Sequence, residues 1–433
     1  MSAAALAAGV AHPVRPMGPG AAVAMFLAFA FAYFFSALLR AVTATLAPVF
    51  SAELQLAAGQ LGLLAGAYFL GFSSMQLPLG SALDRWGPRR VLLCFLAVAV
   101  LGCGAFALAR GFVELLLARL LIGVGVAACL MAPLTCFRHR MSTAAQLRAN
   151  SWMLMTGSLG MLASTLPVQW LLPLIGWRGL FAIVGLLLLL AMAALALAVP
   201  ADAPRSAPEP ATPGSPPPAT AGYRTVFGHP AFVRVAPLGL VVYGGMVAMQ
   251  SLWIGPWLTQ VGGQSPGDAA RGLFIVNLAM LLAFLCWGLA MPRLTRAGWA
   301  GERLIAWAWP LGPLCLAWIL WRGSEAGAFS WALWCVSTSV ISLSQPAVGQ
   351  AFAAALAGRA LSAFNLMIFS GVFAVQWGIG LLIDALRAAG WPVAQAHRLA
   401  FGVFLVLCVL AGLWLNLLRW RADRAATAGI AGR

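Results

Sequence analysis

Long apolar runs separated by short charged breaks dominate this chain. Twelve runs are long enough to cross a lipid bilayer as a helix, since about 20 apolar residues suffice: about 21–45, 58–80, 91–109, 112–135, 150–173, 179–199, 232–258, 272–292, 303–321, 328–351, 363–385 and 397–418. Inside a bilayer every backbone polar group must be satisfied within its own segment, so each run should be helical. The pattern predicts an all-α integral membrane protein with twelve transmembrane helices.

A proline-dense stretch at 200–222 interrupts this pattern. It is poor in apolar residues and has too many prolines to form a helix. We expect a semi-extended linker there, with six runs on either side. The sequence therefore predicts a first six-helix bundle over 1–199, a linker over 200–230 and a second six-helix bundle over 231–433.

The composition fits a membrane protein and argues against a nucleic-acid partner. The chain is 62% hydrophobic and only 8% charged, against roughly 25% charged residues in soluble domains. Its formal net charge is +16 and every basic residue is arginine. The arginines sit in the short breaks between apolar runs and form no basic stripe of the kind that binds nucleic acid. We expect the lipid bilayer as the partner of this surface.

The arginines are distributed unequally between the two sides of the predicted membrane. An even number of spans puts both termini on one side, and only six arginines then lie on the other: Arg110, Arg178, Arg271, Arg322, Arg387 and Arg398. Cytoplasmic loops carry the arginine excess, so both termini should be cytoplasmic. Arginine in place of lysine, with abundant alanine, indicates a GC-rich bacterial genome and hence a bacterial inner membrane. The first eighteen residues look like a short tail with no cleavable signal peptide.

Neither the cysteines nor the histidines form a cluster that would carry chemistry. The cysteines stand alone and mostly inside apolar runs, so we interpret them as small hydrophobic residues. The scattered histidines, at 12, 139, 229 and 397, do not favour an integral-membrane enzyme. We expect no cofactor and no metal. A copper(I) importer remains a remote alternative, on the thioethers of Met153, Met155, Met246 and Met249.

The most specific motif is the break Gly80-Ser-Ala-Leu-Asp-Arg-Trp-Gly-Pro-Arg-Arg90. It resembles the turn between the second and third helices of the major facilitator superfamily. Pro88 stands where that family more often has a basic residue, and the matching positions are Gly80, Asp84, Arg85, Gly87, Arg89 and Arg90. The resemblance extends over essentially the whole chain. It implies two six-helix bundles, a solute site near the midplane and transport by alternating access.

We expect this turn to act as a gate between the two halves. Gly80 would let the end of the second helix approach a neighbour closely. Asp84 would cap a helix N-terminus of the other half, where the helix dipole is positive. The arginines would stay at the lipid headgroups. The alternative is a positive-inside loop without a gating role.

The two halves of the sequence echo one another weakly. Gly80 precedes one charged turn, and Gly288 precedes a second one that contains Gly298. Gly176-Trp-Arg follows the fifth run, and Gly390-Trp-Pro follows the eleventh. Both pairs recur about half a chain apart, as internal repeats of a transporter would.

Two arginines inside predicted spans are the candidates for binding substrate. Arg119-Leu-Leu-Ile-Gly-Val-Gly125 resembles the family's arginine–glycine pattern in helix four, and Arg40 resembles the substrate-binding arginine of its organic-anion transporters. A guanidinium binds carboxylate or phosphate through a bidentate fork. An arginine inside the membrane is costly and is expected to face a cavity or a partner. The alternative is that each snorkels to the outer interface, near Glu114 or Glu53.

Other polar residues in the spans are expected to line the solute path or to hold helices together. Tyr243, Gln250, Trp253 and Gln345 are favoured for the path, because spans one, four, seven and ten line it in this fold; Tyr68 and Gln376 are further candidates. No Asp or Glu lies deep in any span. Glu114, beside Arg119, is therefore the candidate for proton coupling, unless the proton travels on the substrate or the coupling is not to protons.

These features predict a secondary transporter for a small organic anion, acting as a monomer and possibly coupled to protons. Export of a drug or metabolite is the main alternative. The fifth run lacks the Gly-Pro pair that many drug–proton antiporters of the family carry, which lowers this alternative. A non-transporting receptor of the same fold is more remote.

Overall fold

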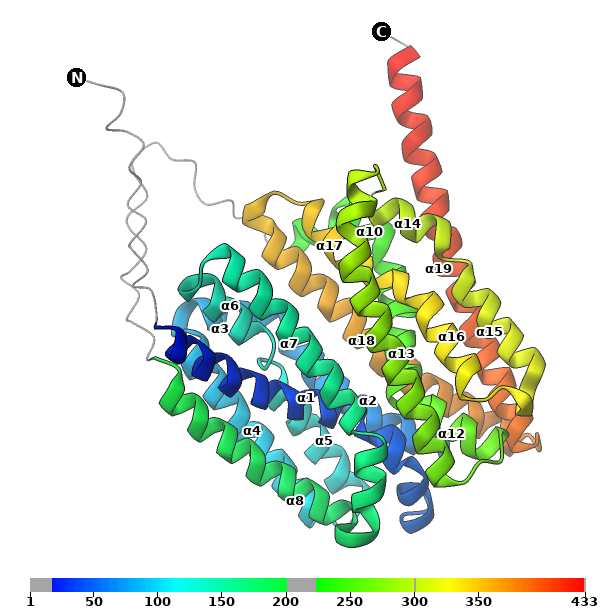
Figure 1. Ribbon diagram of the computed structural model, residues 1–433. Helices are drawn as coiled ribbons and strands as arrows, with labels where there is room; N and C mark the ends of the chain where they lie inside the picture. The colour runs from blue at the N-terminus through cyan, green and yellow to red at the C-terminus, as the bar shows by residue number, and fades with distance from the viewer. Residues whose placement is uncertain (1–17, 201–222, 300, 432–433) are drawn as a thin grey trace.

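A computed structural model describes residues 18–200, 223–299 and 301–431 of the chain. These residues are almost entirely helical and contain no β-strand, which confirms the all-α prediction. In Figure 1 the blue-to-green helices of residues 19–198 lie beside the green-to-red helices of residues 223–431. Most of the predicted tail and the proline-dense linker, at 1–17 and 201–222, lie outside the described residues.

The described residues of the first half, 18–200, form eight helices. In chain order they are α1 (Pro19–Glu53), α2 (Ala58–Ser74), α3 (Gln76–Trp86), α4 (Pro88–Leu108), α5 (Phe112–Val126), α6 (Met131–Arg140), α7 (Thr143–Ala163) and α8 (Leu166–Ala198). Proline at the first or second position begins α1, α4 and α8, where its missing N–H has no helical partner to lose.

The second half is more broken and contains π-helical segments. In chain order it has α9 (Tyr223–Gly228), α10 (Pro230–Pro237), η2 (Leu238–Tyr243), α11 (Gly244–Ala248), η3 (Met249–Trp253), α12 (Ile254–Pro256), η4 (Trp257–Val261), α13 (Pro266–Arg296), α14 (Gly301–Ala308), α15 (Leu311–Arg322), η5 (Gly323–Glu325), α16 (Ala328–Thr338), η6 (Ser339–Leu343), α17 (Ser344–Gln350), α18 (Ala354–Ala388) and α19 (Val393–Ala431).

Nine helical segments among the described residues are long and apolar enough to span a membrane. The other three predicted spans are helical but interrupted. Met75 separates α2 from α3, Ser164 and Thr165 separate α7 from α8, and η6 separates α16 from α17. The count of twelve spans stays a prediction, since these three segments are divided by local breaks.

Four glycines with positive φ mark turns at matching places in the two halves. Gly87 has φ 81° and Gly298 has φ 83°, after the second and eighth predicted spans. Gly176 has φ 64° and Gly390 has φ 87°, after the fifth and eleventh. Only glycine adopts this conformation without a steric penalty. The weak echo in the sequence therefore corresponds to a shared backbone geometry.

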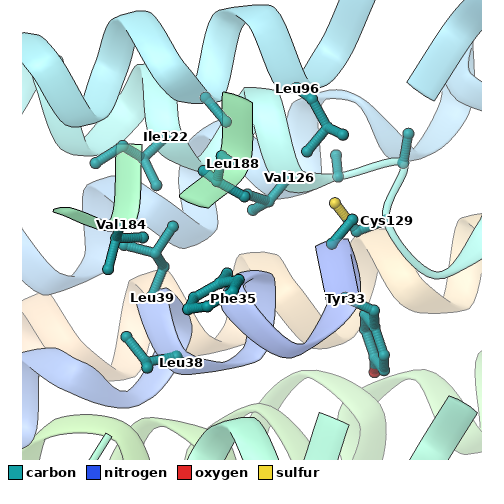
Figure 2. Close-up of a cluster of buried hydrophobic side chains, with 14 of the residues drawn as sticks. Tyr33, Phe35, Leu38, Leu39, Leu96, Ile122, Val126, Cys129, Val184 and Leu188 are labelled. Carbon is teal, nitrogen blue, oxygen red and sulfur yellow. The ribbon is translucent and has the colours of Figure 1, made fainter. Parts of the chain in front are cut away.

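A hydrophobic core holds α1 against α4, α5 and α8. Leu38 and Leu39 of α1 pack near Ile122 of α5 and Val184 and Leu188 of α8, as Figure 2 shows. This packing fixes the rotation of α1 about its axis. Arg40 and Tyr33 are seven residues apart and therefore share one face of the helix, and Tyr33 belongs to this buried cluster.

The two halves make their closest contact between α2 and α18. A Cβ added at Gly62 would overlap the carbonyl oxygen of Gln376 and lie 3.0 Å from its carbonyl carbon. A Cβ at Gly66 would lie 2.9 Å from a ring carbon of Phe373. We predicted such an approach at Gly80, and this was wrong: a Cβ there would meet nothing within 4 Å. The break at Met75 places Gly80 in α3, beyond the tight part of the contact.

One end of this contact is closed by a carboxylate from the other half. Asp384 of α18 accepts hydrogen bonds from the backbone N–H groups of Ala58 at 2.9 Å and Gly59 at 2.7 Å. These are the first two N–H groups of α2, which have no partner inside their own helix. We call this end of the molecule the Glu53 face and the opposite end, which carries the turn at 80–90, the Asp84 face.

Candidate functional site

Arg40 lies where α1 meets both α2 and α18. Its Cζ is 5.6 Å from the ring centroid of Phe72 on α2 and 5.8 Å from that of Phe369 on α18. The two rings touch, with centroids 4.5 Å apart. The side chain is half-buried, and its buried Nε has no hydrogen-bond partner. The guanidinium is thus enclosed by aromatic surface from both halves and keeps donors available.

Three of the four tyrosines of the chain surround this guanidinium. Tyr33, Tyr68 and Tyr243 are all electrostatic neighbours of Arg40. Tyr33 and Tyr68 come from α1 and α2, whereas Tyr243 ends η2 in the second half. Tyr68 is fully buried and donates its hydroxyl to the Ser36 carbonyl oxygen at 3.3 Å. Phenol groups drawn from both halves therefore give Arg40 a polar but uncharged surrounding.

Arg119 is fully buried behind this cluster. It donates from Nη1 to the Leu39 carbonyl oxygen at 3.1 Å and from Nη2 to the Thr43 hydroxyl, both on α1. Its Cζ lies 5.4 Å from the ring centroid of Tyr68. Arg119 thus ties α5 to the two turns of α1 that flank Arg40. This geometry fits a residue that positions the cluster better than one that contacts solute directly.

Neither arginine is neutralised by an acid. The ion pairs among the described residues join Arg178 to Glu53, Arg234 to Glu302, Arg271 to Asp268 and Arg322 to Glu325. The buried polar residues of the described part include no Asp or Glu. Burying a positive charge without a counter-charge is unfavourable. The cluster is therefore electrostatically suited to an anion.

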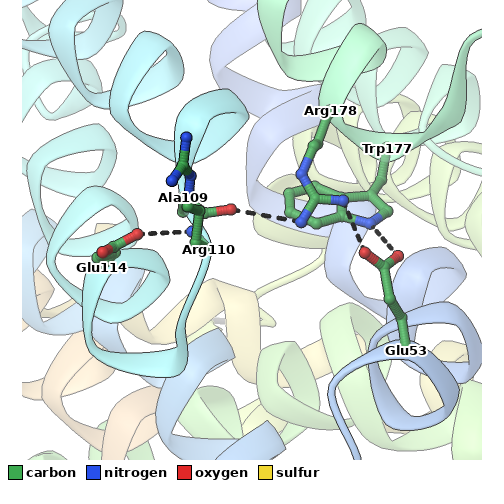
Figure 3. Close-up of polar contacts among 6 residues, drawn as sticks. All are labelled: Glu53, Ala109, Arg110, Glu114, Trp177 and Arg178. Atoms are coloured by element: carbon green, nitrogen blue, oxygen red, sulfur yellow. Dashed lines mark hydrogen bonds and ion pairs between the residues drawn. The ribbon is translucent and has the colours of Figure 1, made fainter.

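Glu114 and Arg119 bond to different parts of the molecule. Glu114 is exposed at the start of α5 and accepts a hydrogen bond from the Arg110 backbone N–H at 2.6 Å (Figure 3). At the same rim, Glu53 accepts from the Trp177 indole and from Arg178, each at 2.6 Å, and Arg178 also donates to the Ala109 carbonyl oxygen. These contacts join α1, α8 and the turn before α5 at the rim. Proton coupling through Glu114 stays a prediction.

The remaining polar candidates bond to neighbouring helices of the second half. Gln250 donates to Asn277 at 2.9 Å, and Gln345 donates to Asn365 at 2.5 Å. The Trp253 indole donates to the Gln376 carbonyl oxygen at 3.2 Å, and the Gln376 side chain donates to Ser251 at 3.0 Å. The structure thus brings Arg40, Tyr68 and Tyr243 together. The other four candidates have hydrogen-bond partners on neighbouring helices: Gln250, Trp253, Gln345 and Gln376. Their contact with substrate stays a prediction.

The motif at 80–90 is mostly helix. Asp84 and Arg85 lie exposed in the last turn of α3, and the turn itself is Gly87, followed by Pro88 at the start of α4. Arg89 donates to the Ala196 carbonyl oxygen of α8 at 2.5 Å.

The helix that carries this motif packs against the other half. α3 contacts α18, and Tyr223 of α9 donates its hydroxyl to the Leu77 carbonyl oxygen at 3.4 Å. Burial raises the pKa of the Tyr223 hydroxyl, which therefore remains a donor at neutral pH. The exposed Arg90 and the other motif residues thus lie beside a contact between the halves, although their role in gating stays a prediction.

An open groove of about 680 Å³ lies in the first half, away from Arg40. It is lined by side chains of α1, α7 and α8, including Leu27, Phe31, Phe34, Thr156, Leu190 and Leu197. Leu27 is 58% exposed and Leu197 is 89% exposed, as lipid-facing side chains would be. We do not assign this groove to the solute path.

The methionines considered for copper lie in separate cores. Met153 packs in the core of residues 25–199, and Met246 and Met249 pack in a core of the second half. No group of three or more His, Cys, Asp or Glu side chains suited to a metal ion occurs among the described residues. The thioethers of Met153, Met246 and Met249 thus pack against apolar neighbours in two different cores.

Residues 29–376 match the family model of the Major Facilitator Superfamily. The chain belongs to this superfamily. Solved structures support the fold: a bacterial homolog of the human lysosomal transporter Spinster, inward-facing and unoccupied, superposes with a TM-score of 0.73 at 17% identity, covering 93% of this chain and 98% of that one. A D-xylose–proton symporter gives a TM-score of 0.69 at 18% identity, covering 91% and 96%.

Curated relatives match over shorter stretches. The hexuronate transporter of Bacillus subtilis (strain 168) is 37% identical over 86 residues, which are 20% of each chain. The multidrug resistance protein MdtM of Salmonella typhimurium (strain LT2) is 28% identical over 224 residues, 47% of this chain and 52% of that protein. The chain thus spans between a fifth and about half of the length of these relatives.

Three members of the Arg40 cluster were missed in the sequence. Tyr33 carried a usable signal, because it lies two helical turns before Arg40 on the same face. Phe72 and Phe369 carried none, since phenylalanines are common in these spans and only the packing of α2 on α18 brings these two to Arg40.

Proposed function

We propose that this transporter carries a small organic anion bearing a carboxylate group. The observation that carries the proposal is Arg40, a guanidinium without an acidic partner, enclosed by aromatic groups of both halves. A guanidinium pairs with a carboxylate through two parallel hydrogen bonds. The phenol groups of Tyr33 and Tyr243 would supply further donors for the oxygen atoms of the anion.

A sugar acid is the first substrate to test. The B. subtilis relative is named a hexuronate transporter, and a hexuronate combines one carboxylate with several hydroxyl groups. Such a molecule would engage Arg40 by its carboxylate and the phenols by its hydroxyls. We further propose a bacterial inner membrane location, two six-helix halves and a cytoplasmic Asp84 face, supported by the arginine excess on that side.

Export of a drug is the second candidate, because the longer match is to MdtM. The aromatic rings around Arg40 would accept a flat apolar molecule. A cationic drug is disfavoured, since Arg40 and Arg119 would repel it and the buried residues described here offer no carboxylate.

Thermal unfolding of the purified full-length protein tests the proposal. Glucuronate and galacturonate, simple carboxylates, phosphate, amino acids and cationic dyes are added singly to the wild type and to Arg40→Ala. A ligand at about 100 times its Kd stabilises the folded state by about 2.7 kcal/mol. We expect carboxylates to raise the Tm of the wild type and not of Arg40→Ala.

Arg271→Ala is the matched control, because Arg271 is exposed at the Glu53 face and pairs only weakly with Asp268, at 3.4 Å. It should retain the full carboxylate response. Stabilisation by neutral or cationic compounds alone, unchanged in Arg40→Ala, would refute the anion proposal.

A further inference from the structure

His397 is a buried histidine with one unpaired ring nitrogen. It lies one turn into α19 and is 1% exposed. Its Nδ1 is 2.9 Å from the Val393 carbonyl oxygen. A carbonyl oxygen only accepts, so Nδ1 carries the hydrogen and donates it, and Nε2 bears a lone pair. Nε2 is buried and has no hydrogen-bond partner, a situation that calls for a reason.

The surroundings of His397 are aromatic. Its ring meets Trp253 at 6.2 Å and Phe401 at 6.1 Å between centroids, both edge to face. The segments η3, α12 and η4, over 249–261, contain no charged residue. A proton bound at Nε2 would therefore create an imidazolium without an adjacent acid.

Most charged groups on the other elements around this end of α19 have partners other than His397. Arg322 and Glu325 pair with each other at 3.1 Å, and the Arg398 guanidinium lies beside Gly323. On α18, Arg387 donates to the Trp391 carbonyl oxygen, and Asp384 accepts from the start of α2. Neither carboxylate, Glu325 or Asp384, therefore forms an ion pair with His397.

Trp253 links His397 to the contact between the halves. Its indole N–H donates to the Gln376 carbonyl oxygen at 3.2 Å. The same oxygen is the atom against which Gly62 of α2 packs. Two turns further along α18, Asp384 caps α2. One indole ring therefore separates the histidine from the contact that closes the Glu53 face.

We propose that Nε2 of His397 is the proton-binding site through which this transporter couples to protons. The proton adds to the Nε2 lone pair, and no covalent bond of the protein breaks. The buried imidazolium lacks a counter-charge, which disfavours the closed Glu53 face. Separation of α2 from α18 admits water and removes that penalty, so proton binding and opening are linked. The proposal uses the transport activity of the family and is independent of the anion specificity.

His397 suits this role better than other groups in the described part. Among the buried side chains there, histidine is the type whose ordinary pKa is nearest neutral, because the buried set contains no Asp or Glu and its arginine stays charged. It also lies near the Glu53 face, which is the outer face in the proposed orientation. A proton from the outer side would therefore pass one turn of α19 to reach His397.

The test measures opening of the Glu53 face without substrate. Spin labels are attached at Ala52→Cys and Ala389→Cys, both exposed on this face and in different halves, with Cys94, Cys286 and Cys315 replaced by alanine. Distance distributions are recorded in lipid nanodiscs between about pH 8 and about pH 5.5, the range over which histidine titrates. We expect the ratio of long to short distances to rise by about tenfold at low pH, equivalent to about 1.4 kcal/mol.

His397→Gln should abolish this pH-dependent shift. His229→Gln is the control and should retain the shift, since the Nδ1 of His229 caps α10 and takes no part in the α2–α18 contact. Trp253→Phe should keep the fold and weaken the shift, because it retains a ring and loses the indole bond. An absent shift in the wild type, or an undiminished one in His397→Gln, overturns the proposal. If His397→Gln does not fold, the comparison of the wild type with Trp253→Phe tests the proposal. An equal pH-dependent shift in these two proteins overturns the proposal. A carboxylate response lost in Arg40→Ala with no pH shift would overturn the coupling role alone.

Discussion

Gly62 on α2 is the position at which the close approach of the two halves can be tested most directly. In Gly62→Ala the new Cβ overlaps the Gln376 carbonyl oxygen and lies 3.0 Å from the carbonyl carbon and 3.2 Å from the Trp377 Cα. All three are backbone atoms of α18, so no rotamer change can relieve the contact. The two helices must move apart.

The size of the effect follows from these distances. Carbon atoms pack at about 3.5–4.0 Å, so α2 and α18 must separate by at least about 0.5 Å. Overpacking of this kind costs about 1–3 kcal/mol. If the Glu53 face opens as proposed, by separation of α2 from α18, the penalty applies only to the closed conformation. The closed-to-open ratio should fall by about 5- to 150-fold.

Alanine is also a better helix former than glycine, by about 1 kcal/mol. That gain is the same in both conformations and does not enter the ratio. Gly378→Ala on α18 is the matched control, because a Cβ there meets nothing within 4 Å. The assay is the distance distribution between labels at positions 52 and 389, at fixed neutral pH. If Gly62→Ala and Gly378→Ala both reproduce the wild-type distribution, α2 and α18 do not form the closed gate.

Two further predictions concern polar contacts of the Glu53 face. Asp384→Asn keeps one acceptor oxygen for α2 and loses the charge, which should destabilise the closed conformation by about 1 kcal/mol. The same label pair should therefore show a smaller opening than in Gly62→Ala. An unchanged distance distribution would contradict the capping role of Asp384. The Glu53–Arg178 pair is 40% and 46% exposed, so its coupling energy in a double-mutant cycle of Glu53→Gln and Arg178→Gln should not exceed about 1 kcal/mol and should shrink in salt; a larger, salt-independent value would speak against this.

The membrane architecture could be predicted from the sequence because it depends on local composition. An apolar run of sufficient length must be helical in a bilayer whatever surrounds it. The turns at Gly87, Gly176, Gly298 and Gly390 were also visible, since a glycine between two runs marks a reversal of the chain. The break at Met75 was missed, although Pro78 carries a signal for it: proline has no N–H to donate to the Ser74 carbonyl oxygen four residues earlier.

The residue types of the candidate site were predictable, and their grouping was not. An arginine inside an apolar run is rare enough to be singled out, which identified Arg40 and Arg119. Which of the two has donors to spare depends on α1: Leu39 and Thr43 engage Arg119, whereas the Arg40 Nε has no partner. Phe369 and Tyr243 lie far from Arg40 along the chain, so no local pattern connects them.

The sequence by itself determined a helical membrane protein with arginines inside its apolar runs, because hydropathy and charge act over a few residues. The tertiary structure alone decided how the halves meet. The close approach lies at Gly62 rather than Gly80, since it depends on which face of α2 turns toward α18. It also decided that Nε2 of His397 is buried without a hydrogen-bond partner and is linked to that contact through Trp253. Burial and hydrogen-bond partners depend on tertiary packing and cannot be read from the residue type.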